Sequence, residues 1–326
     1  MKVKTNSILA WWLAMRPKTL TGAAAPVLVG GSMAFVYMVY SHARADWSAP
    51  AFLQCLPSAL LPFGLCLLFA MLMQIDANFI NDYFDFKKGS DREDRLGPER
   101  ACAQGWVTPH AMRVAIVVTT ALSCLVGLVI MSLHSQYELL LVGALCVLFC
   151  FLYTTKLSYL GWGDMLVLIF FGIVPVFFTC YVMTGGEWCV PVVIAGVAMG
   201  LATDTLLVVN NYRDRNQDAI SGKRTLIVRL MKKYADSPNG KEGLQACQDL
   251  YLWLGVFATL LSVVALFLYP LSSIRYPLMA VYLILHFRTF RRLQSLDGRD
   301  LNMVLGETAR NIFLFGLLFA ANVLIS

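Results

Sequence analysis

Amide and carboxylate side chains are concentrated between residues 74 and 85, at the end of a long apolar segment. An ionisable group inside lipid costs roughly 3 kcal/mol, so these groups are expected to face a polar cavity. At about 100° per residue, four of the side chains project from one narrow stripe of a helix. The four are Asn78, Asn81, Asp82 and Asp85. Their converging oxygens predict a site for a hard cation such as Mg²⁺.

Basic residues follow this stripe and indicate an anion beside the cation. They are Lys87, Lys88, Arg92, Arg95 and Arg100. The alternative is a helix that simply ends in a solvated, charged loop. A connection as long as 83–110 is usually functional or disordered, and its charge and its Gly97-Pro98 turn favour a clamp over the site.

A second stretch, 201–230, repeats the same plan four apolar segments later. Its acidic and amide residues are Asp204, Asn210, Asn211, Asp214 and Asp218, and its basic residues are Lys223, Arg224 and Arg229. Asp214 and Asp218 are one helical turn apart and therefore share a face. The repetition argues against a simple helix end and predicts one pseudo-symmetric site built from both stretches.

Two charged residues flank a short turn between the fourth and fifth apolar segments. Lys156 is the only basic residue of that turn, and we predict a contact to phosphate. Its alternative is a lysine that reaches from lipid to the membrane surface. Asp164 is equally well explained as a charge that stabilises a helix N-terminus.

The composition is typical of a membrane protein with several spanning helices. Of the 326 residues, 58% are hydrophobic and 14% are charged, with a mean hydropathy of +0.66, which excludes an ordinary soluble domain. Nine windows are long and apolar enough to cross about 30 Å of hydrocarbon. They are 20–40, 58–82, 111–132, 137–155, 163–184, 190–211, 251–269, 274–290 and 306–325.

We therefore predict an all-α bundle of nine transmembrane helices around a central polar site that opens to the cytoplasm and to lipid. Residues 1–326 are expected to form a single domain, in which 83–110 and 212–249 are cytoplasmic loops over the site. The first apolar window is expected to stay in the mature chain, because no small-residue cleavage site follows it.

The distribution of basic residues predicts the orientation of the chain. With the N-terminus in the cytoplasm, every Lys and Arg except Arg44 and Arg275 lies in a cytoplasmic segment, as the positive-inside rule requires. The net charge of +6 follows from this topology and indicates no nucleic-acid partner. The nine cysteines lie mostly in apolar windows without a metal-binding pattern and are predicted to pack between helices.

The two acidic stretches predict chemistry on a diphosphate. Mg²⁺ is usually held by a few carboxylates together with phosphates of the substrate, whereas neither a phosphate-binding P-loop nor an EF-hand spacing occurs. Because the site opens into lipid, the diphosphate is expected to carry a long hydrocarbon. An allylic tail would leave the diphosphate as a stabilised cation and react with an electron-rich acceptor kept away from water.

The motifs NDYFD with the later Asp91, and RDRNQD, resemble the paired Asp-rich motifs of the UbiA-type intramembrane prenyltransferases. Three stretches are most similar to the branch of that family that acts on 1,4-dihydroxy-2-naphthoate in menaquinone biosynthesis. They are WWLAMRPKTL, NDYFDFKKGSDREDRLGPERACAQGWVTP and VVNNYRDRNQDAISGKRTLIVRL. The resemblance implies a multi-pass enzyme of the bacterial inner membrane that uses polyprenyl diphosphate and releases CO₂ and diphosphate.

The resemblance also implies roles for individual residues. The implied metal ligands are Asp82, Asp85, Asp91, Asp214 and Asp218, of which all but Asp91 are also implied to be catalytic. The implied substrate contacts are Asn78, Asn81, Lys87, Arg95, Lys156, Asn211, Lys223, Arg224 and Arg229. The family usually has an acid four residues after the position of Asp85, where this chain has Gly89.

Two alternative functions differ in acceptor or in class. Another aromatic acid such as 4-hydroxybenzoate would be prenylated by the same chemistry. A secondary transporter would also have paired polar helices, but near the membrane midplane, whereas these acids lie at the cytoplasmic helix ends. Asp76 projects about 200° away from Asn78 on the helix and is expected to matter less to catalysis.

Overall fold

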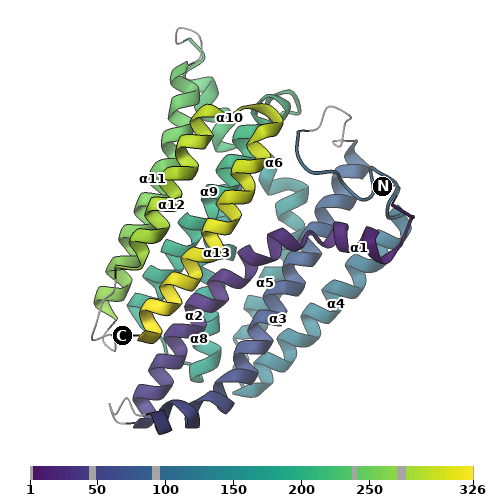
Figure 1. The fold of residues 1–326 in the computed structure, drawn as a ribbon. Helices are drawn as coiled ribbons and strands as arrows, with labels where there is room; N and C mark the ends of the chain where they lie inside the picture. The colour runs from purple at the N-terminus through teal and green to yellow at the C-terminus, as the bar shows by residue number, and fades with distance from the viewer. Residues whose placement is uncertain (1–2, 44–48, 90–95, 237–240, 270–276, 326) are drawn as a thin grey trace.

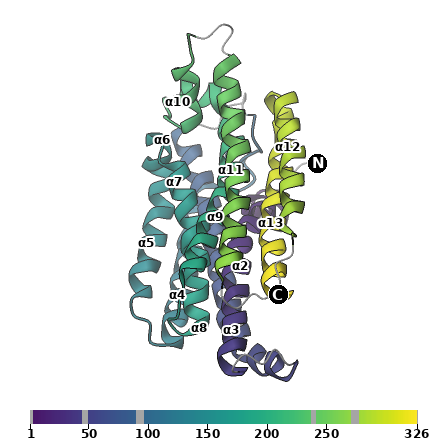
Figure 2. The same cartoon turned by 90° about the vertical axis from the view of Figure 1, so that its left-hand side faces the viewer.

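The computed structural model describes residues 3–43, 49–89, 96–236, 241–269 and 277–325, and all regular structure in this part is helical. The helices form one bundle, with α11, α12 and α13 on one side and α3, α4 and α5 on the other (Figure 1 and Figure 2). The predicted all-α fold is confirmed.

The bounds of the helices are as follows. The elements are α1 Ile8–Met15, α2 Pro17–Ala43, α3 Ala49–Lys88, α4 Pro109–Leu133, α5 Leu139–Leu152, π-helix η1 Tyr153–Leu157, α6 Ser158–Leu160, α7 Gly163–Leu168, π-helix η2 Ile169–Ile173, α8 Val174–Thr184, α9 Val190–Ile220, α10 Leu226–Lys233, α11 Lys241–Leu268, α12 Met279–Ser295, the 3₁₀-helix η4 Gly298–Asp300 and α13 Leu301–Ile325.

Seven helical runs in the described residues are long and apolar enough to cross a membrane. They are α2, α3, α4, α7 to α8, α9, α11 and η4 to α13. The windows 137–155 and 274–290 fall on the shorter helices α5, of 14 residues, and α12, of 17 residues. The protein is therefore a multi-pass membrane protein, and the count of nine spans stays a prediction.

Of the two segments expected to be loops, 212–249 is largely helical in its described part, whereas 83–110 is helical only at its two ends, where α3 stops and α4 begins. Helix α3 continues to Lys88 and stops at Gly89, whose φ is +65°. No proline or glycine interrupts the last turns of α3. The two lysines of its last turn stabilise the helix, because their positive charges lie at the negative end of the helix dipole. Helix α9 likewise continues to Ile220, so both acidic motifs lie on rigid helices.

Small residues allow the helices around the site to approach closely. Gly196 and Gly200 on α9 form a small-xxx-small pair, and Gly172 of η2 packs against both. A Cβ atom added to Gly172 would lie 2.4 Å from the Cα atom of Gly200. Such close approach is how membrane helices gain packing energy, because lipid provides no hydrophobic force between them.

The chain changes direction between α1 and α2 at Arg16, whose φ of 51° is unusual for a residue with a side chain. Pro17 follows, and the residue before a proline is disfavoured in helical conformation. Helix α1 leaves Ile8 90% exposed and Trp12 56% exposed, as expected for a helix that lies on a membrane surface.

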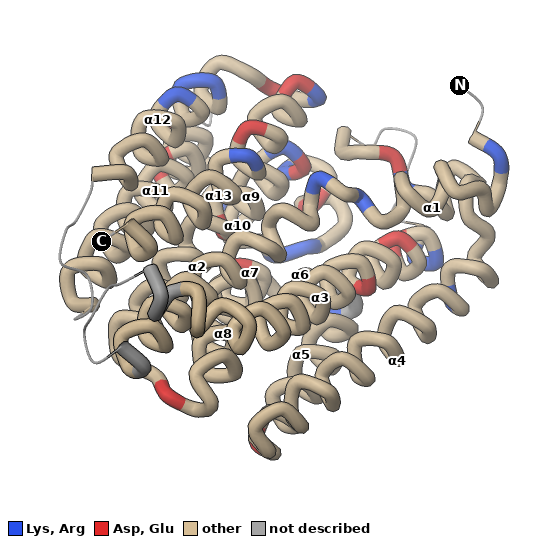
Figure 3. Tube along the Cα trace, turned by 60° about the horizontal axis from the view of Figure 1, so that its bottom comes forward, with Lys and Arg blue, Asp and Glu red and all other residues tan. Residues whose placement is uncertain are grey.

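Charged residues gather toward one end of the bundle, and few of the described ones lie near the other end (Figure 3). This end contains the C-terminal parts of α3 and α9. The acidic motifs and the basic residues thus share one end of the bundle, and the membrane surface at which that end lies stays a prediction.

Candidate active site

A cavity of about 890 Å³ lies between the helices and has one polar end. The side chains at that end are Asn81, Asp85, Lys88, Arg100, Asn210, Asn211, Asp214, Gln217, Asp218 and Lys223. The structure thus brings together six of the predicted site residues, namely Asn81, Asp85, Asn211, Asp214, Asp218 and Lys223. They come from α3, from α9 and from the turn after α9, as the two acidic stretches predict.

The rest of the cavity is apolar and runs between α2, α3, α5 and α8. Its walls include Phe69, Met73, Val142, Phe149, Phe170, Phe171, Val174, Phe178 and Val182. The lining residues of the α7–α8 run extend from Gly163 to Val182, a distance of about 28 Å at 1.5 Å per residue. The cavity can therefore hold a molecule with a charged head and a long hydrocarbon.

On the α3 side of the cavity, carboxylate and cations lie close together. The Nη2 atom of Arg100 is 2.8 Å from Oδ2 of Asp85, and Arg100 is itself buried. One turn beyond Asp85, the ammonium of Lys88 lies 4.3 Å from the ring centroid of Tyr159 in α6. These contacts place two positive charges beside one predicted metal ligand.

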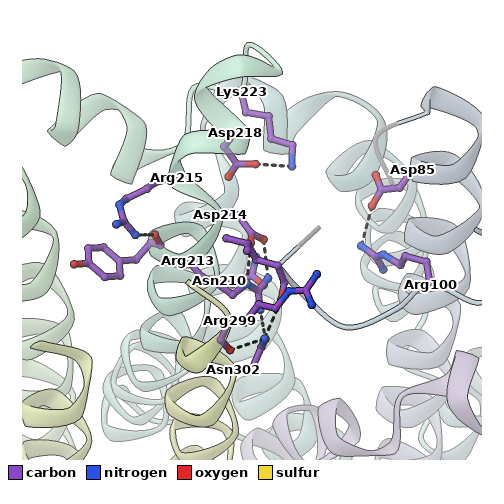
Figure 4. A network of polar contacts seen from close by, with 12 residues as sticks. Asp85, Arg100, Asn210, Arg213, Asp214, Arg215, Asp218, Lys223, Arg299 and Asn302 are labelled. Carbon is purple, nitrogen blue, oxygen red and sulfur yellow. Dashed lines mark hydrogen bonds and ion pairs between the residues drawn. The ribbon is translucent and has the colours of Figure 1, made fainter. Parts of the chain in front are cut away.

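On the α9 side, Asp214 belongs to a network built around the buried guanidinium of Arg213 (Figure 4). Arg213 donates to both carboxylate oxygens of Asp214, at 2.7 and 2.6 Å, and to Oδ1 of Asn210 at 2.9 Å. It also donates to Oδ1 of Asn302 on α13 at 2.8 Å, and Asn302 donates to the carbonyl of Leu96 at 2.8 Å. The network fixes Asp214 relative to α13 and to the segment after α3.

Asp218, one turn beyond Asp214, pairs with Lys223 at 3.0 Å between Oδ1 and Nζ. Burial by itself lowers the pKa of the Lys223 ammonium, but attraction by Asp218 and Asp85 outweighs it and raises the pKa above the ordinary value. Lys223 is therefore positively charged at neutral pH. Figure 4 shows the Asp85–Arg100 pair facing the Asp214 and Asp218 pairs from the other side of the site.

Asp82, predicted to be a metal ligand, does not line the cavity. It is 1% exposed, and its two oxygens accept hydrogen bonds from the backbone N–H groups of Ala101 and Cys102, both at 2.8 Å. The physical reason is that the segment after α3 folds back onto this edge of the helix and needs an acceptor for its amides. Asp82 thus anchors the segment that carries Arg100.

The substitution Asp82→Asn is expected to lower the free energy of unfolding by about 1.5–3 kcal/mol, the usual value of a hydrogen bond to a charged group. The NH₂ group of the new asparagine would face one of the two backbone N–H donors, so one of the two hydrogen bonds would be lost. Chemical unfolding of the purified protein in detergent measures the loss. Unchanged stability together with a lost affinity for Mg²⁺ would contradict this assignment and return Asp82 to the metal site.

Asn78 is likewise absent from the cavity lining, although two of its hydrogen-bond partners, Thr19 and Gln74, line the cavity. It is 3% exposed, and its Nδ2 atom donates to the carbonyl of Met15 and to Oγ1 of Thr19, both at 2.9 Å. Its Oδ1 atom accepts a hydrogen bond from Gln74 at 3.3 Å. Asn78 therefore holds α3 against the α1–α2 corner, and its predicted contact to substrate stays a prediction.

Four basic residues predicted to contact substrate lie outside the cavity. They are Lys87, Lys156, Arg224 and Arg229, all of them exposed. Arg229 donates to the carbonyl of Leu160 at 2.8 Å and so ties α10 to the turn after α6. Periodicity could not separate these side chains from Lys88, Arg100 and Lys223, because loops and helix ends turn neighbouring residues in different directions.

Three further residues singled out in the sequence lie outside the described part of the chain or away from the cavity. Asp91 and Arg95 lie outside the described residues. Asp76 is fully buried and accepts hydrogen bonds from the hydroxyls of Thr119 and Thr120 on α4, both at 2.7 Å. It therefore faces away from the cavity, as the helical projection predicts.

Arg213 is the site residue that sequence reasoning missed most clearly. It is 2% exposed and organises Asp214, Asn210 and Asn302. The signal was present, because an arginine between apolar residues and an acidic motif is costly unless it is paired. Its distant partner Asn302, on α13, has no such signal in the sequence.

The donor atoms at the polar end fit Mg²⁺. Carboxylate and amide oxygens come from Asp85, Asp214, Asp218, Asn81 and Asn211, and Mg²⁺ prefers oxygen ligands. No group of three His, Cys, Asp or Glu side chains in the described part of the chain is close enough to hold a metal by itself. The set is therefore suited to a cation that completes its coordination with substrate phosphates and water.

Comparison with known proteins agrees with this geometry. The model of the UbiA prenyltransferase family matches residues 47–311. The chain belongs to the UbiA prenyltransferase family. It is 34% identical over 274 residues, 82% of this chain and 84% of the relative, to a 1,4-dihydroxy-2-naphthoate octaprenyltransferase of Mycobacterium tuberculosis. The protein of that name from Escherichia coli K12 is 34% identical over 230 residues, 68% of each chain.

A solved UbiA homologue has the same fold as this UbiA family member. It comes from Archaeoglobus fulgidus and was bound to GPP and Mg²⁺, with a TM-score of 0.55, 14% sequence identity and coverage of 97% of this chain and all of that chain. The apolar helices and the family match together make this chain a multi-pass membrane protein of the UbiA prenyltransferase family.

Proposed function

We propose that this protein transfers a polyprenyl group from polyprenyl diphosphate to 1,4-dihydroxy-2-naphthoate, with release of CO₂ and diphosphate and formation of demethylmenaquinol, the reduced form of demethylmenaquinone. One observation carries the proposal: a single cavity joins the acidic ends of α3 and α9 to an apolar channel. The names of the bacterial relatives support the choice of acceptor.

Asp85, Asp214 and Asp218, with the amide oxygens of Asn81 and Asn211, are the residues that would hold Mg²⁺. Bound there, Mg²⁺ would neutralise the diphosphate and so favour its departure. Asp82 and Asn78 are left out of this set because their polar atoms are engaged elsewhere.

The basic residues that pair with the acids can also bind the phosphates of the substrate. Arg100, Arg213 and Lys223 each neutralise one of the three carboxylates. When a divalent cation takes over that neutralisation, Arg100 and Lys223 can turn N–H donors to phosphate oxygens. Arg213 is tied to Asn210 and Asn302 as well, and we expect it to stay and hold Asp214 in place.

The apolar channel holds the prenyl group and keeps the reacting carbon dry. Its aromatic and aliphatic walls hold the polyprenyl tail and exclude water from the allylic carbon. The C–O bond to diphosphate breaks, and the electron pair leaves with the diphosphate. The ring carbon that carries the carboxylate forms the new C–C bond, and loss of CO₂ returns the electron pair that restores the aromatic ring.

We further propose that residues 1–326 act as one domain in the bacterial inner membrane, with the N-terminus and the polar end of the cavity on the cytoplasmic side. The distribution of Lys and Arg supports this orientation. The charge clustering at one end of the bundle is compatible with it (Figure 3).

The acceptor is tested by the mass of the product. Purified protein with Mg²⁺ and an isotopically labelled polyprenyl diphosphate is incubated with either 1,4-dihydroxy-2-naphthoate or 4-hydroxybenzoate. We expect a prenylated, decarboxylated naphthoquinol from the first acid and no product from the second. Prenylated 4-hydroxybenzoate would overturn the proposed acceptor but not the reaction class, and a product from neither acid would overturn the function.

A further inference from the structure

Two carboxyl groups outside the acidic motifs, the half-buried Asp164 and the buried Asp204, each have one oxygen that no donor of the described chain satisfies. Asp164 begins α7 and lines the cavity, and Asp204 lies on α9, 6% exposed. The Oδ1 atom of each is closed to solvent and accepts no hydrogen bond from the described residues. The two side chains lie within electrostatic range of each other where α7 packs on α9.

The backbone just before Asp164 is held in place by the surrounding structure. The turn before Asp164 contains Gly161, whose φ is +83° and whose Cα approaches the carbonyl of Arg224 so closely that a Cβ would lie 2.1 Å from it. Arg229 and the backbone N–H of Arg224 fix the same turn through the carbonyls of Leu160 and Tyr159. Arg229 lies within electrostatic range of Asp164, but its Nη2 atom donates to the carbonyl of Leu160 instead. A buried acceptor without a donor is costly, and a donor supplied by a ligand would remove that cost.

The position of Asp164 indicates which ligand brings that donor. Tyr153 lines the cavity and lies within electrostatic range of Asp85 and Asp218 as well as of Asp164 and Asp204. Asp164 is thus near the point where the diphosphate end meets the apolar channel. A fully ionised diphosphate has no hydrogen-bond donor, and a polyprenyl tail has none. Among the proposed reactants, only the ring hydroxyls of the aromatic acceptor can donate.

We propose that the carboxyl group of Asp164 accepts a hydrogen bond from a ring hydroxyl of the aromatic acceptor, with Asp204 behind it as a second acceptor that favours the same orientation. This assignment rests on the proposed function and adds the residue that recognises the acceptor. The carboxylate of the acceptor then points away from Asp164, because like charges repel. The hydrogen bond also increases electron density in the ring, which favours attack on the allylic carbon without any net loss of a proton.

The test uses purified full-length protein and three compounds. They are 1,4-dihydroxy-2-naphthoate as substrate, and 1-hydroxy-2-naphthoate and 4-hydroxy-2-naphthoate as competitive inhibitors, each of which lacks one ring hydroxyl. The variants are Asp164→Ala and the more conservative Asp164→Asn. Asp76→Asn serves as the matched control, since Asp76 is a buried carboxyl that faces Thr119 and Thr120 rather than the cavity.

We expect Asp164→Ala to raise the KM for 1,4-dihydroxy-2-naphthoate by about 10- to 100-fold, the range that corresponds to a hydrogen bond to a charged acceptor. The inhibition constant of one analogue should rise equally, whereas that of the analogue lacking the contacted hydroxyl should stay within about twofold. Asp164→Asn, which keeps an acceptor oxygen, should show a smaller loss. The affinity for polyprenyl diphosphate with Mg²⁺, measured by calorimetry, should not change in either variant.

Two results would overturn the proposal. Equal losses of affinity for all three aromatic compounds would show that Asp164 contacts no ring hydroxyl. A lost affinity for polyprenyl diphosphate with Mg²⁺ would assign Asp164 to the metal site. If Asp164→Ala does not fold, an unchanged pattern of constants in Asp164→Asn would also reject it. Failure of the proposed function is distinguishable, because the unmodified protein would then give no prenylated naphthol at all.

Discussion

Replacement of Asp85 or Asp214 by asparagine is expected to lower turnover by about 10²–10³-fold, as for loss of one charged group that stabilises a transition state. Each exchange is nearly isosteric, so it removes a metal-binding charge and leaves the packing intact. The rate of prenylated naphthoquinol formation should be measured in detergent-solubilised protein whose thermal stability matches that of the unmodified chain. The double variant should lose little more than either single variant, because the two acids act as one unit.

Two neighbouring acids on α3 provide the controls for this experiment. Asp82 accepts hydrogen bonds from the amides of Ala101 and Cys102, and Asp76 accepts them from two threonines of α4. Asp76→Asn and the folded fraction of Asp82→Asn should therefore turn over within about tenfold of the unmodified rate. Near-normal rates in Asp85→Asn and Asp214→Asn, with activity abolished in Asp82→Asn at equal stability, would show that the other edge of α3 carries the chemistry.

Removal of divalent cations is expected to abolish turnover, and added Mg²⁺ should restore it. The physical reason is that Arg100, Arg213 and Lys223 already balance the three carboxylates, so the charge of the diphosphate is not neutralised unless a divalent cation binds. Product formation is measured after dialysis against EDTA and again after titration with Mg²⁺. The tail alone should still enter the apolar channel, so binding of an uncharged polyprenol should not depend on the metal.

Turnover that persists after thorough chelation would contradict the metal assignment. In that case Arg100, Arg213 and Lys223 alone would have to neutralise the leaving diphosphate. A matched control is the Asp85→Asn variant, which should require a higher Mg²⁺ concentration for half-maximal rate. An unchanged requirement in that variant would remove Asp85 from the metal site while leaving metal dependence intact.

The sequence by itself determined the membrane character, the two helices that carry the acids, and the seven of the nine predicted windows that coincide with long apolar helices in the described residues. These properties are local: length and hydropathy decide whether a segment can span a bilayer, and charges inside apolar segments must face something polar. The same reasoning placed Asp76 away from the site, because a helical projection depends only on residue spacing. The ends of α3 and α9 were predicted too early, because both helices extend into charged sequence that is equally compatible with a loop.

Only the tertiary structure decided which edge of the acidic stripe faces the cavity. On a helix the four oxygen-bearing residues 78, 81, 82 and 85 cover about 100°, wide enough for its two edges to meet different neighbours. Asn81 and Asp85 face the cavity, whereas Asn78 contacts the α1–α2 corner and Asp82 contacts the segment that folds back after α3. The partners that decide this come from distant parts of the chain and were not encoded in the spacing of the motif.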